Sequence, residues 1–302
     1  MNTSLQTRTV ARLIQAIDSQ DGAGVKLKRS LGRGATTRVD PFLMLDAFSS
    51  ANPDDYIAGF PPHPHRGFET VTYMLDGHMI HRDHMGNEGD LRAGGVQWMT
   101  AGRGVIHEER PKMSEGLMRG FQLWINLPAS EKMKPAAYQN IEPEEVPVVT
   151  LNNGSIIKAI AGALELELEL ELELELELEL ELEGQTISGP INSGSTQAIY
   201  LDVHIPAGQK ITLPIANHLS AFVYLFEGSA AIEEQTLTGN SAAVLTAGDL
   251  VSISAPDQPA RFLLIAGKPI GEPIAQYGPF VMNTMEEVEQ AMQDYQNNTL
   301  TD

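Results

Sequence analysis

The sequence predicts an all-β protein made of two related barrels, followed by one C-terminal helix. Short apolar runs recur along both halves of the chain and are interrupted by Gly, Pro, Asp and Asn, a pattern typical of β-sandwiches and barrels. The two halves also share a layout, because Leu75-Asp-Gly77 followed by Ala93-Gly94 has a counterpart in Phe226-Glu-Gly228 followed by Ala247-Gly248. A helical pattern is expected only near the end of the chain.

The first half predicts an N-terminal domain at residues 1–135. Its Asp76-Gly77 dipeptide predicts a tight hairpin, since these residues tolerate the positive φ angles that such a turn requires. Residues 128–147 are richer in Lys, Glu and Pro and have weak strand character, so we place the domain boundary within them. The main apolar runs of this half lie at residues 70–75, 96–100 and 121–127.

The second half predicts a C-terminal domain at residues 136–302. A helix is expected at residues 284–297, because Thr284-Met-Glu-Glu287 matches a capping box and apolar side chains follow at helical spacing. We expect that apolar stripe to be a packing face. The predicted strands of this half lie at residues 198–205, 220–226, 242–245, 250–254 and 262–265.

Residues 164–183 are ten consecutive Leu-Glu dipeptides. A single strand of this length would extend about 66 Å, beyond the size of a small barrel. A helix would have no defined apolar stripe, and a long hairpin would bring glutamates together on one face. We interpret the tract as an expanded insertion in a loop or hairpin of the second domain. The alternative is an exposed strand edge that promotes oligomerisation.

The composition excludes several classes of protein. The net charge is −20, and without the ten glutamates of the tract it is still −10, which argues against direct nucleic-acid binding. The sequence has no run of eighteen apolar residues and no apolar N-terminal segment behind basic residues, so we expect a cytoplasmic protein without a membrane span. With no cysteine, any metal must be bound by histidines and carboxylates.

Two pairs of potential metal ligands carry the functional prediction. His63 and His65 form one pair, and His107 and Glu109 form the other, each with spacing i, i+2 inside an expected strand. Because alternate side chains of a strand share a face, two neighbouring strands would direct all four groups toward one point. An isolated His-x-His pair is common on surfaces, but here Pro61-Pro62 and a glycine-rich turn at residues 102–104 constrain the backbone beside both pairs.

Three imidazoles and one carboxylate would suit one divalent transition metal, and ligand softness alone leaves Fe, Ni, Co, Mn, Cu and Zn open. Fe(II) is the first choice, because the set resembles the non-haem iron facial triad with one extra histidine. His78, His81 and His84 are expected on the surface or beside the site, because His81 and His84 do not share a strand face. Arg66 and Arg103 are expected to hold carboxylates or backbone near the site, or to pair on the surface. For Trp98, Phe121 and Trp124 core packing is preferred over an aromatic pocket wall.

Three long motifs resemble the pirin family: His63-Pro-His-Arg-Gly-Phe-Glu-Thr70, Gln97-Trp-Met-Thr-Ala-Gly-Arg-Gly-Val-Ile-His107 and Gly278-Pro-Phe-Val-Met-Asn-Thr284. The resemblance extends from about residue 25 to about residue 296, except across the Leu-Glu tract, and includes Asp40-Pro-Phe-Leu43 and Ser130-Glu-Lys-Met133. It implies two cupin barrels, packed face to face, with a metal only in the N-terminal one. His204 and His218 of the second half lack an i, i+2 partner.

The resemblance also implies the ligands, which are His63, His65, His107 and Glu109. Glu69 stands where many cupins place a carboxylate ligand, but in pirins the glutamate at position 109 replaces it. Pro111 occupies the place of the usual second-motif Asn. We therefore expect Glu69 to be buried or to support the site without binding the metal.

The function that the resemblance implies is that of a quercetin 2,3-dioxygenase. The expected substrates are a flavonol and dioxygen, with cleavage of the 2,3 bond and release of carbon monoxide. Glu109 would accept the proton of the flavonol 3-hydroxyl, and the metal would act as a Lewis acid. The alternative is a redox-sensing regulatory protein that binds a transcription factor or a metabolic enzyme, since the acidic composition suits a protein partner better than DNA.

Overall fold

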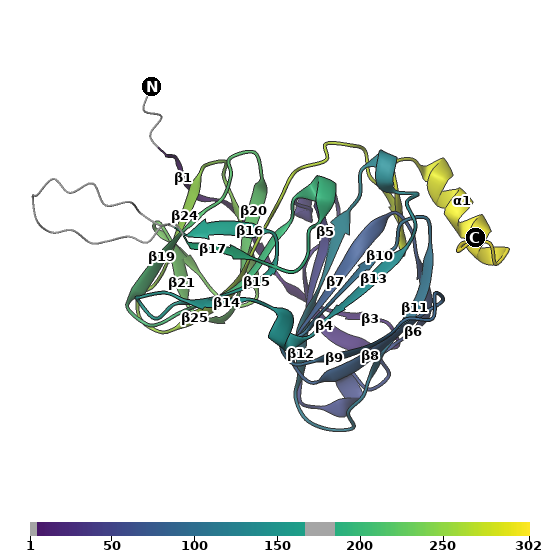
Figure 1. Cartoon of the computed structure of the whole chain (residues 1–302), viewed down its shortest axis with the longest axis horizontal. Helices are drawn as coiled ribbons and strands as arrows, with labels where there is room; N and C mark the ends of the chain where they lie inside the picture. The colour runs from purple at the N-terminus through teal and green to yellow at the C-terminus, as the bar shows by residue number, and fades with distance from the viewer. Residues whose placement is uncertain (1–4, 167–184) are drawn as a thin grey trace, which may run out of the picture.

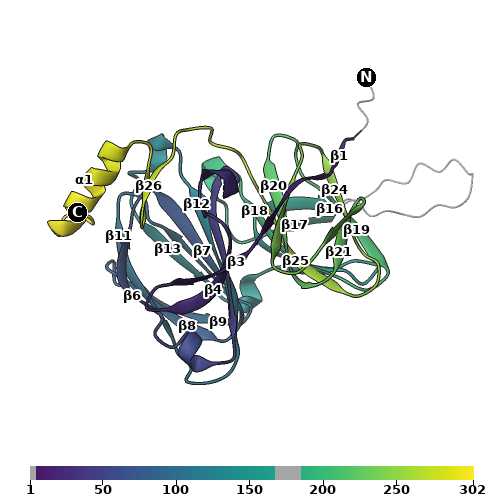
Figure 2. The same cartoon turned by 180° about the vertical axis from the view of Figure 1, so that it is seen from behind.

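The computed structural model describes residues 5–166 and 185–302. Within these residues the two halves of the chain lie side by side as two β-barrels (Figure 1). The rear view shows the same two bodies, with helix α1 (Met285–Gln296) at the outer edge of the N-terminal barrel (Figure 2). The prediction of two β domains and a C-terminal helix is confirmed, and Thr284 caps that helix with Glu287 as expected.

Two sheets form the N-terminal barrel. The larger has the strand order β13 (Ala137–Ile141), β10 (Val96–Thr100), β7 (Phe68–Asp76), β12 (Met118–Asn126), β5 (Phe42–Ser50), β4 (Val25–Leu31) and β3 (Ile17–Asp21). The smaller has the order β6 (Phe60–His65), β11 (Val105–Pro111), β8 (His78–Asp83) and β9 (Glu88–Arg92). The short 3-10 turns η1 (Ala35–Thr37), η2 (Pro53–Asp55) and η3 (Ala129–Glu131) connect strands of this half, and η4 (Pro143–Glu145) leads from β13 into the C-terminal barrel.

The C-terminal barrel follows the same plan. Its larger sheet has the order β14 (Val148–Thr150), β15 (Ile156–Ala161), β18 (Ile199–Ile205), β25 (Ala260–Gly267), β20 (Ser220–Gly228), β23 (Ser241–Leu245) and β2 (Val10–Gln15). Its smaller sheet contains β1 (Thr7–Arg8), β24 (Leu250–Ala255), β21 (Ala230–Ile232) and β22 (Gln235–Leu237), with β19 (Gln209–Pro214) also paired to β24. The remaining elements are the hairpins β16 (Ala163–Leu166) with β17 (Gln185–Ser188) and β26 (Ala275–Tyr277) with β27 (Phe280–Met282), and the turn η5 (Gly194–Thr196).

The two larger sheets pack face to face through a shared apolar core. Rings from both halves meet there, with Phe42 and Phe222 at 5.4 Å and Tyr73 and Tyr200 at 6.2 Å between ring centroids. The Tyr73 hydroxyl donates a buried hydrogen bond of 2.6 Å to Asp202 of the other half. The face-to-face arrangement expected of a double barrel is therefore present.

Strand β7 shows how the larger sheet contributes both to the core between the barrels and to the interior of the N-terminal barrel. Val71 and Tyr73 point into the core between the barrels, whereas Thr72 and Met74 point into the N-terminal barrel, because side chains alternate along a strand. Every one of these four side chains is at least nine-tenths buried. The strand therefore has no solvent face, which explains why its sequence lacks a simple alternation of polar and apolar residues.

Three segments cross the expected boundary between residues 135 and 136. Strands β1 and β2 pair with β24 and β23 of the C-terminal barrel, and β13 pairs with β10 of the N-terminal barrel. The hairpin β26–β27 and helix α1 pack on the N-terminal barrel, where Arg66 forms a β-bridge with Phe280. Each barrel is thus completed by a segment from the opposite end of the described chain.

Two local predictions differ from the structure or lie outside it. Asp76 and Gly77 do not close a hairpin, because β7 and β8 belong to different sheets, and the turn instead forms a barrel corner at which Gly77 has a φ of 101°. Most of the Leu-Glu tract, residues 167–184, lies outside the described residues. The chain on either side of it forms the antiparallel hairpin β16–β17, in which Leu164 and Leu166 are buried in the C-terminal core.

Candidate metal centre

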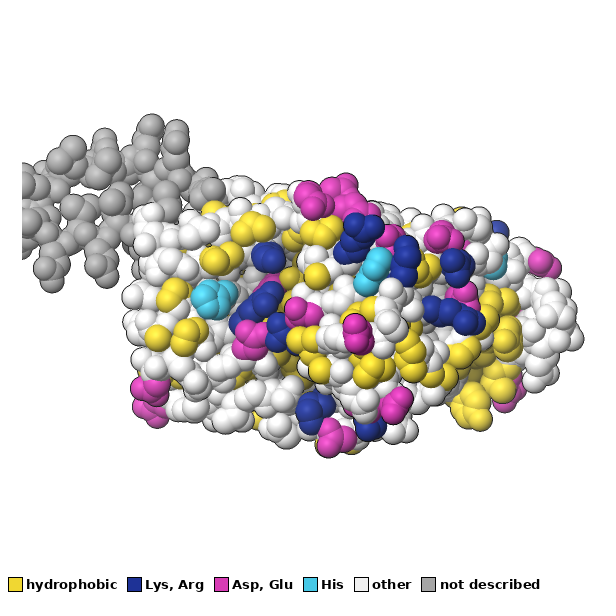
Figure 3. Space-filling view, turned by 90° about the horizontal axis from the view of Figure 1, so that it is seen from below, with side chains coloured by type: hydrophobic (Ala, Val, Ile, Leu, Met, Phe, Trp, Pro, Cys, Tyr) yellow, Lys and Arg dark blue, Asp and Glu magenta, His cyan; other side chains and the backbone are white. Residues whose placement is uncertain are grey.

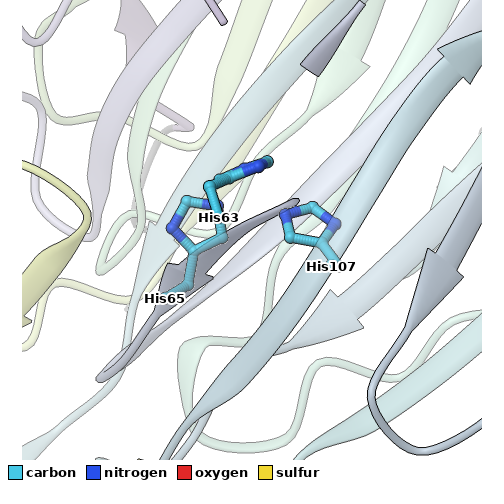
Figure 4. Close-up of side chains that lie close together, drawn as sticks. All are labelled: His63, His65 and His107. Carbon is cyan, nitrogen blue, oxygen red and sulfur yellow. The ribbon is translucent and has the colours of Figure 1, made fainter. Parts of the chain in front are cut away.

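Strands β6 and β11 bring three of the predicted ligands together inside the N-terminal barrel. The two strands are antiparallel neighbours, and their register places His107 directly opposite His63 and Val105 opposite His65. One ring nitrogen from each of His63, His65 and His107 lies within 4.8 Å of the other two. The three imidazoles converge on a common point (Figure 4).

Two of these rings have one nitrogen held by the protein. His63 donates from Nδ1 to the carbonyl oxygen of Pro61 at 2.8 Å, and His107 Nδ1 lies 3.4 Å from His81 Nδ1. The buried Nδ1 of His65 has no partner among the described residues. His107 Nε2 is likewise buried without a partner there. Orienting one ring nitrogen by a protein acceptor is typical of histidines that bind metals through the other.

Burial keeps two of the rings uncharged. Desolvation, followed by the proximity of the other imidazoles, holds the pKa values of His65 and His107 well below the ordinary histidine value. A neutral imidazole retains the lone pair that coordinates a metal. His63 is more accessible than the other two rings, which are at most 3% exposed, so the cluster is approached from the His63 side.

Glu109 is buried on β11, the strand that also carries His107, but it does not belong to the group formed by His63, His65 and His107. Its carboxylate groups with His81 and His107, with ligand atoms again within 4.8 Å of one another. The register of β6 and β11 shifts between His107 and Glu109, which offsets the carboxylate from the other pair. Thr72 and Gln122 each donate a hydrogen bond of 3.2 Å to one of its oxygens.

Glu69 lies on the opposite face of the larger sheet from this cluster. Its carboxylate accepts hydrogen bonds from Trp98 Nε1 at 3.2 Å and from Thr100 Oγ1 at 2.7 Å, and it lies 3.3 Å from the ammonium group of Lys134. Strand alternation explains the difference. Glu69 shares the strand face of Val71, which points to the core between the barrels, whereas Thr72 points into the barrel interior. The expectation that Glu69 is buried without joining the ligands agrees with this geometry.

Of the two positions expected for His81, on the surface or beside the site, the structure shows the second. This histidine is only 1% exposed, contacts His107, and stacks on Tyr138 with 4.1 Å between ring centroids and 8° between the ring planes. Strand β8 pairs with β11 so that His81 is directly opposite Glu109. The signal that would have identified it is the His81-x-Asp83 spacing, which places two polar side chains on one face of a strand.

The arginine and aromatic residues have specific roles around the cluster. Arg66 is buried and donates to the carbonyl oxygens of Arg103 and Leu300 and to the carboxylate of Asp294, so it holds the C-terminal segment rather than the metal cluster. Trp124 lies with its ring centroid 5.2 Å from that of His65 and stacks on Phe68 at 4.2 Å. Trp98 and Phe121 pack in the core between the barrels, as expected.

Comparison with known proteins assigns the family. Two family models match the chain, Pirin at residues 24–125 and the pirin C-terminal cupin domain at residues 200–301. The chain belongs to the pirin family. A Pseudomonas aeruginosa member provisionally named quercetin 2,3-dioxygenase is 46% identical over 296 residues, which cover 97% of this chain and 98% of that protein. Human pirin is 37% identical over 297 residues, covering 96% and 93% of the two chains.

A solved structure supports the same assignment. The crystal structure of quercetin 2,3-dioxygenase from Acinetobacter baumannii matches this pirin with a TM-score of 0.84 at 31% identity, covering 97% of this chain and 98% of the other. The cupin architecture of both halves, predicted from the motifs, is thereby confirmed. The imidazole-rich interior of the first barrel is a donor set suited to a divalent transition metal.

The surface charges bear on the prediction that the chain does not bind nucleic acid directly. On the face seen from below, Lys and Arg side chains are intermixed with Asp and Glu, without a separate basic surface (Figure 3). No helix within residues 5–166 and 185–302 has the length and apolar character needed to span a membrane.

Proposed function

We propose that this pirin is a metal-dependent dioxygenase that cleaves flavonols such as quercetin at the 2,3 bond with release of carbon monoxide. The observation that carries the proposal is the convergence of His63, His65 and His107, two of which, His63 and His107, are oriented through their second nitrogen. Support for the reaction comes from the relatives, because the Acinetobacter baumannii structure bears the name of this enzyme.

We assign His63, His65, His107 and Glu109 as the ligands of one divalent metal per chain, with Fe(II) as the first choice and Ni, Co, Mn, Cu or Zn as alternatives. When bound, the metal would act as a Lewis acid toward the flavonol and hold it beside dioxygen. The three neutral imidazoles contribute no charge, so the site as a whole stays cationic with a single carboxylate. That charge favours an anionic substrate oxygen over a neutral one.

Glu109 is the residue that we expect to handle the substrate proton. Hydrogen bonds from Thr72 and Gln122 hold both of its carboxylate oxygens inside the barrel. A carboxylate positioned in this way can accept the proton of the flavonol 3-hydroxyl, provided that the hydroxyl comes within hydrogen-bond distance. The apolar walls formed by Phe68 and Trp124 beside His65 would exclude water from the aromatic substrate.

The test is aerobic incubation of the protein with quercetin after loading with each of the six metals in turn. We expect loss of quercetin together with stoichiometric carbon monoxide for at least one metal. A His63→Ala variant should lose this activity, whereas His218→Ala, which changes an exposed histidine of the second barrel, should retain it. Absence of turnover with every metal would contradict the dioxygenase, and equal turnover by His63→Ala would contradict the site.

A further inference from the structure

Asp83 and His81 form a buried chain of polar groups that ends at His107. His81 Nε2 lies 3.3 Å from Asp83 Oδ2, and His81 Nδ1 lies 3.4 Å from His107 Nδ1. The side chains of His81 and Asp83 are 2% and 0% exposed, so no solvent competes for these contacts. Neither residue belongs to the four ligands proposed above.

The Asp83 end of the chain can only accept hydrogen bonds. Its Oδ1 accepts from the backbone N–H groups of Met85 at 2.9 Å and Asn87 at 3.1 Å, and its Oδ2 accepts from the Asn87 side-chain amide at 2.9 Å. All three of these partners are donors, and a carboxylate offers them only acceptors. The nitrogen of His81 that faces Asp83 must therefore carry a proton.

The proton on His81 Nε2 determines which nitrogen of His107 carries a proton. A neutral His81 that carries its proton on Nε2 has a lone pair on Nδ1 and can only accept there. His107 must then donate from its own Nδ1, which leaves the lone pair of His107 on Nε2. That nitrogen is the buried one without a partner among the described residues, on the side of the ring that faces His63 and His65.

The surroundings hold the His81 ring in the plane that this chain needs. Tyr138 stacks on it almost in parallel, at 4.1 Å between centroids. Gly89 makes room for Tyr138, since a Cβ at that position would lie 1.6 Å from the tyrosine hydroxyl. Rotation of His81 away from Asp83 or His107 would disrupt this stack.

We propose that Asp83 and His81 are positioning residues, which set His107 in the one tautomer whose free nitrogen faces the metal cluster. The proposal rests on the ligand set assigned above, but not on the reaction that the metal supports. As a consequence, metal affinity depends on the carboxylate of Asp83, which His81 and His107 separate from the metal.

The deciding variant is Asp83→Asn. Two backbone N–H groups fix the oxygen position at Oδ1, so the new amide nitrogen replaces Oδ2 and donates toward His81 Nε2, while the Asn87 amide, which donates to Oδ2 in the original protein, must turn to present its oxygen. The polarity of the chain then reverses, and the proton of His107 moves from Nδ1 to Nε2. We expect nitrogen NMR of metal-free protein labelled at histidine to show this change of tautomer, and metal affinity to fall about 10–100-fold.

The chain itself offers a matched control. His78 and Asp90 form a second His–Asp contact, from β8 to β9, but both side chains are about 30% exposed and neither belongs to the groups of converging ligand atoms. Asp90→Asn should leave the His107 tautomer and the metal affinity unchanged. A second variant, His81→Phe, keeps an aromatic ring against Tyr138 while removing the acceptor, and should also weaken metal binding.

Two results would overturn the proposal. One is an unchanged His107 tautomer in folded Asp83→Asn protein. The other is binding of two metals per chain with loss of one in His81→Phe, which would make His81 a ligand in the group with His107 and Glu109. Because the tautomer is measured without metal or quercetin, a failure of the dioxygenase assay alone leaves this test intact.

Discussion

The two barrels share a strand plan but differ in what fills them. The first encloses buried histidines, Glu109 and Gln97 beside its apolar residues, whereas the apolar cluster that fills the second contains aliphatic side chains and Phe262. In the first barrel Glu109 is held by two hydrogen bonds, and His65 Nδ1 and His107 Nε2 are among the buried polar atoms that lack a partner within the described residues. If the metal is held where we propose, one copy of the fold carries the chemistry and the other supplies apolar burial.

This division has an energetic reason. A buried polar group costs stability unless it is hydrogen-bonded, so the first barrel gains less from folding than an apolar interior of the same size. The second barrel shares the large apolar core between the sheets and thereby supports the first. The buried contact from Tyr73 to Asp202, which Arg261 also pairs at 2.6 Å, fixes the two sheets relative to each other.

The largest effect should come from removing a ligand in the first barrel. We expect His107→Ala to reduce metal affinity by more than about 100-fold, since a direct ligand contributes more than a residue that only orients one. His218→Ala in the second barrel is the control and should bind metal like the original protein. Chelator competition measures both affinities. Equal binding by the two variants would mean that the metal is not held where we place it.

A substitution in the second barrel should lower the stability of the protein without changing its metal affinity. Phe262→Ala removes a fully buried ring and is expected to lower the free energy of unfolding by about 3–5 kcal/mol. Urea unfolding measures this loss. The metal affinity of the variant, measured where it is still folded, should stay within about twofold of the original. A large loss of affinity would show that the barrels are coupled and not divided as we infer.

The two buried glutamates of the first half give a finer comparison. Glu109→Gln should weaken metal binding by about 10-fold or more, because the substitution removes the only carboxylate that we assign to the metal. Glu69→Gln should leave that affinity unchanged and cost about 1 kcal/mol of stability, through a weakened contact with Lys134. Isothermal titration of both variants with Co(II) distinguishes them. A stronger effect at Glu69 would reverse the assignment of the two carboxylates.

The smallest effect concerns pH and the buried Lys132, whose ammonium group donates to Gly67, Asn126 and Val281 at 2.7–2.9 Å. Desolvation lowers the pKa of Lys132 to about 8, from 10.5 in the unfolded chain. Between these values the unfolded state binds more protons, so stability rises with pH. We expect the original protein to gain about 1 kcal/mol relative to Lys132→Met between pH 8 and pH 9. Urea unfolding at both pH values checks the sign, and parallel pH profiles would contradict it.

Much of the metal centre was accessible from the sequence. Strand alternation alone brings His63 and His65 to one face and predicts their approach to His107, and the family motifs single out Glu109. The offset of Glu109 from the other pair was not predictable, because it depends on a register shift between β6 and β11. His81 was compared with His84 and not with Asp83, its partner on the same strand face.

The pairing of the N-terminal strands with the second barrel was not predicted from the sequence. A strand pattern reveals that a segment is extended, but not which distant strand it joins, so β1 and β2 were placed with the residues that follow them. Arg8 shows the strength of the actual attachment. Its buried guanidinium donates to the carbonyl oxygens of Thr246, Ala216 and Leu219 at 2.8–3.0 Å in the second barrel.

The exchange of end segments has a consequence for the order in which the protein matures. Arg66, which follows His65 directly, is held through its backbone by Pro279 and Val281 and through its side chain by Asp294, all more than 200 positions later in the chain. During synthesis the first barrel leaves the ribosome early, yet its histidine cluster lacks these partners until residues 279–294 have emerged. The half that is translated first is therefore the last to complete its histidine cluster.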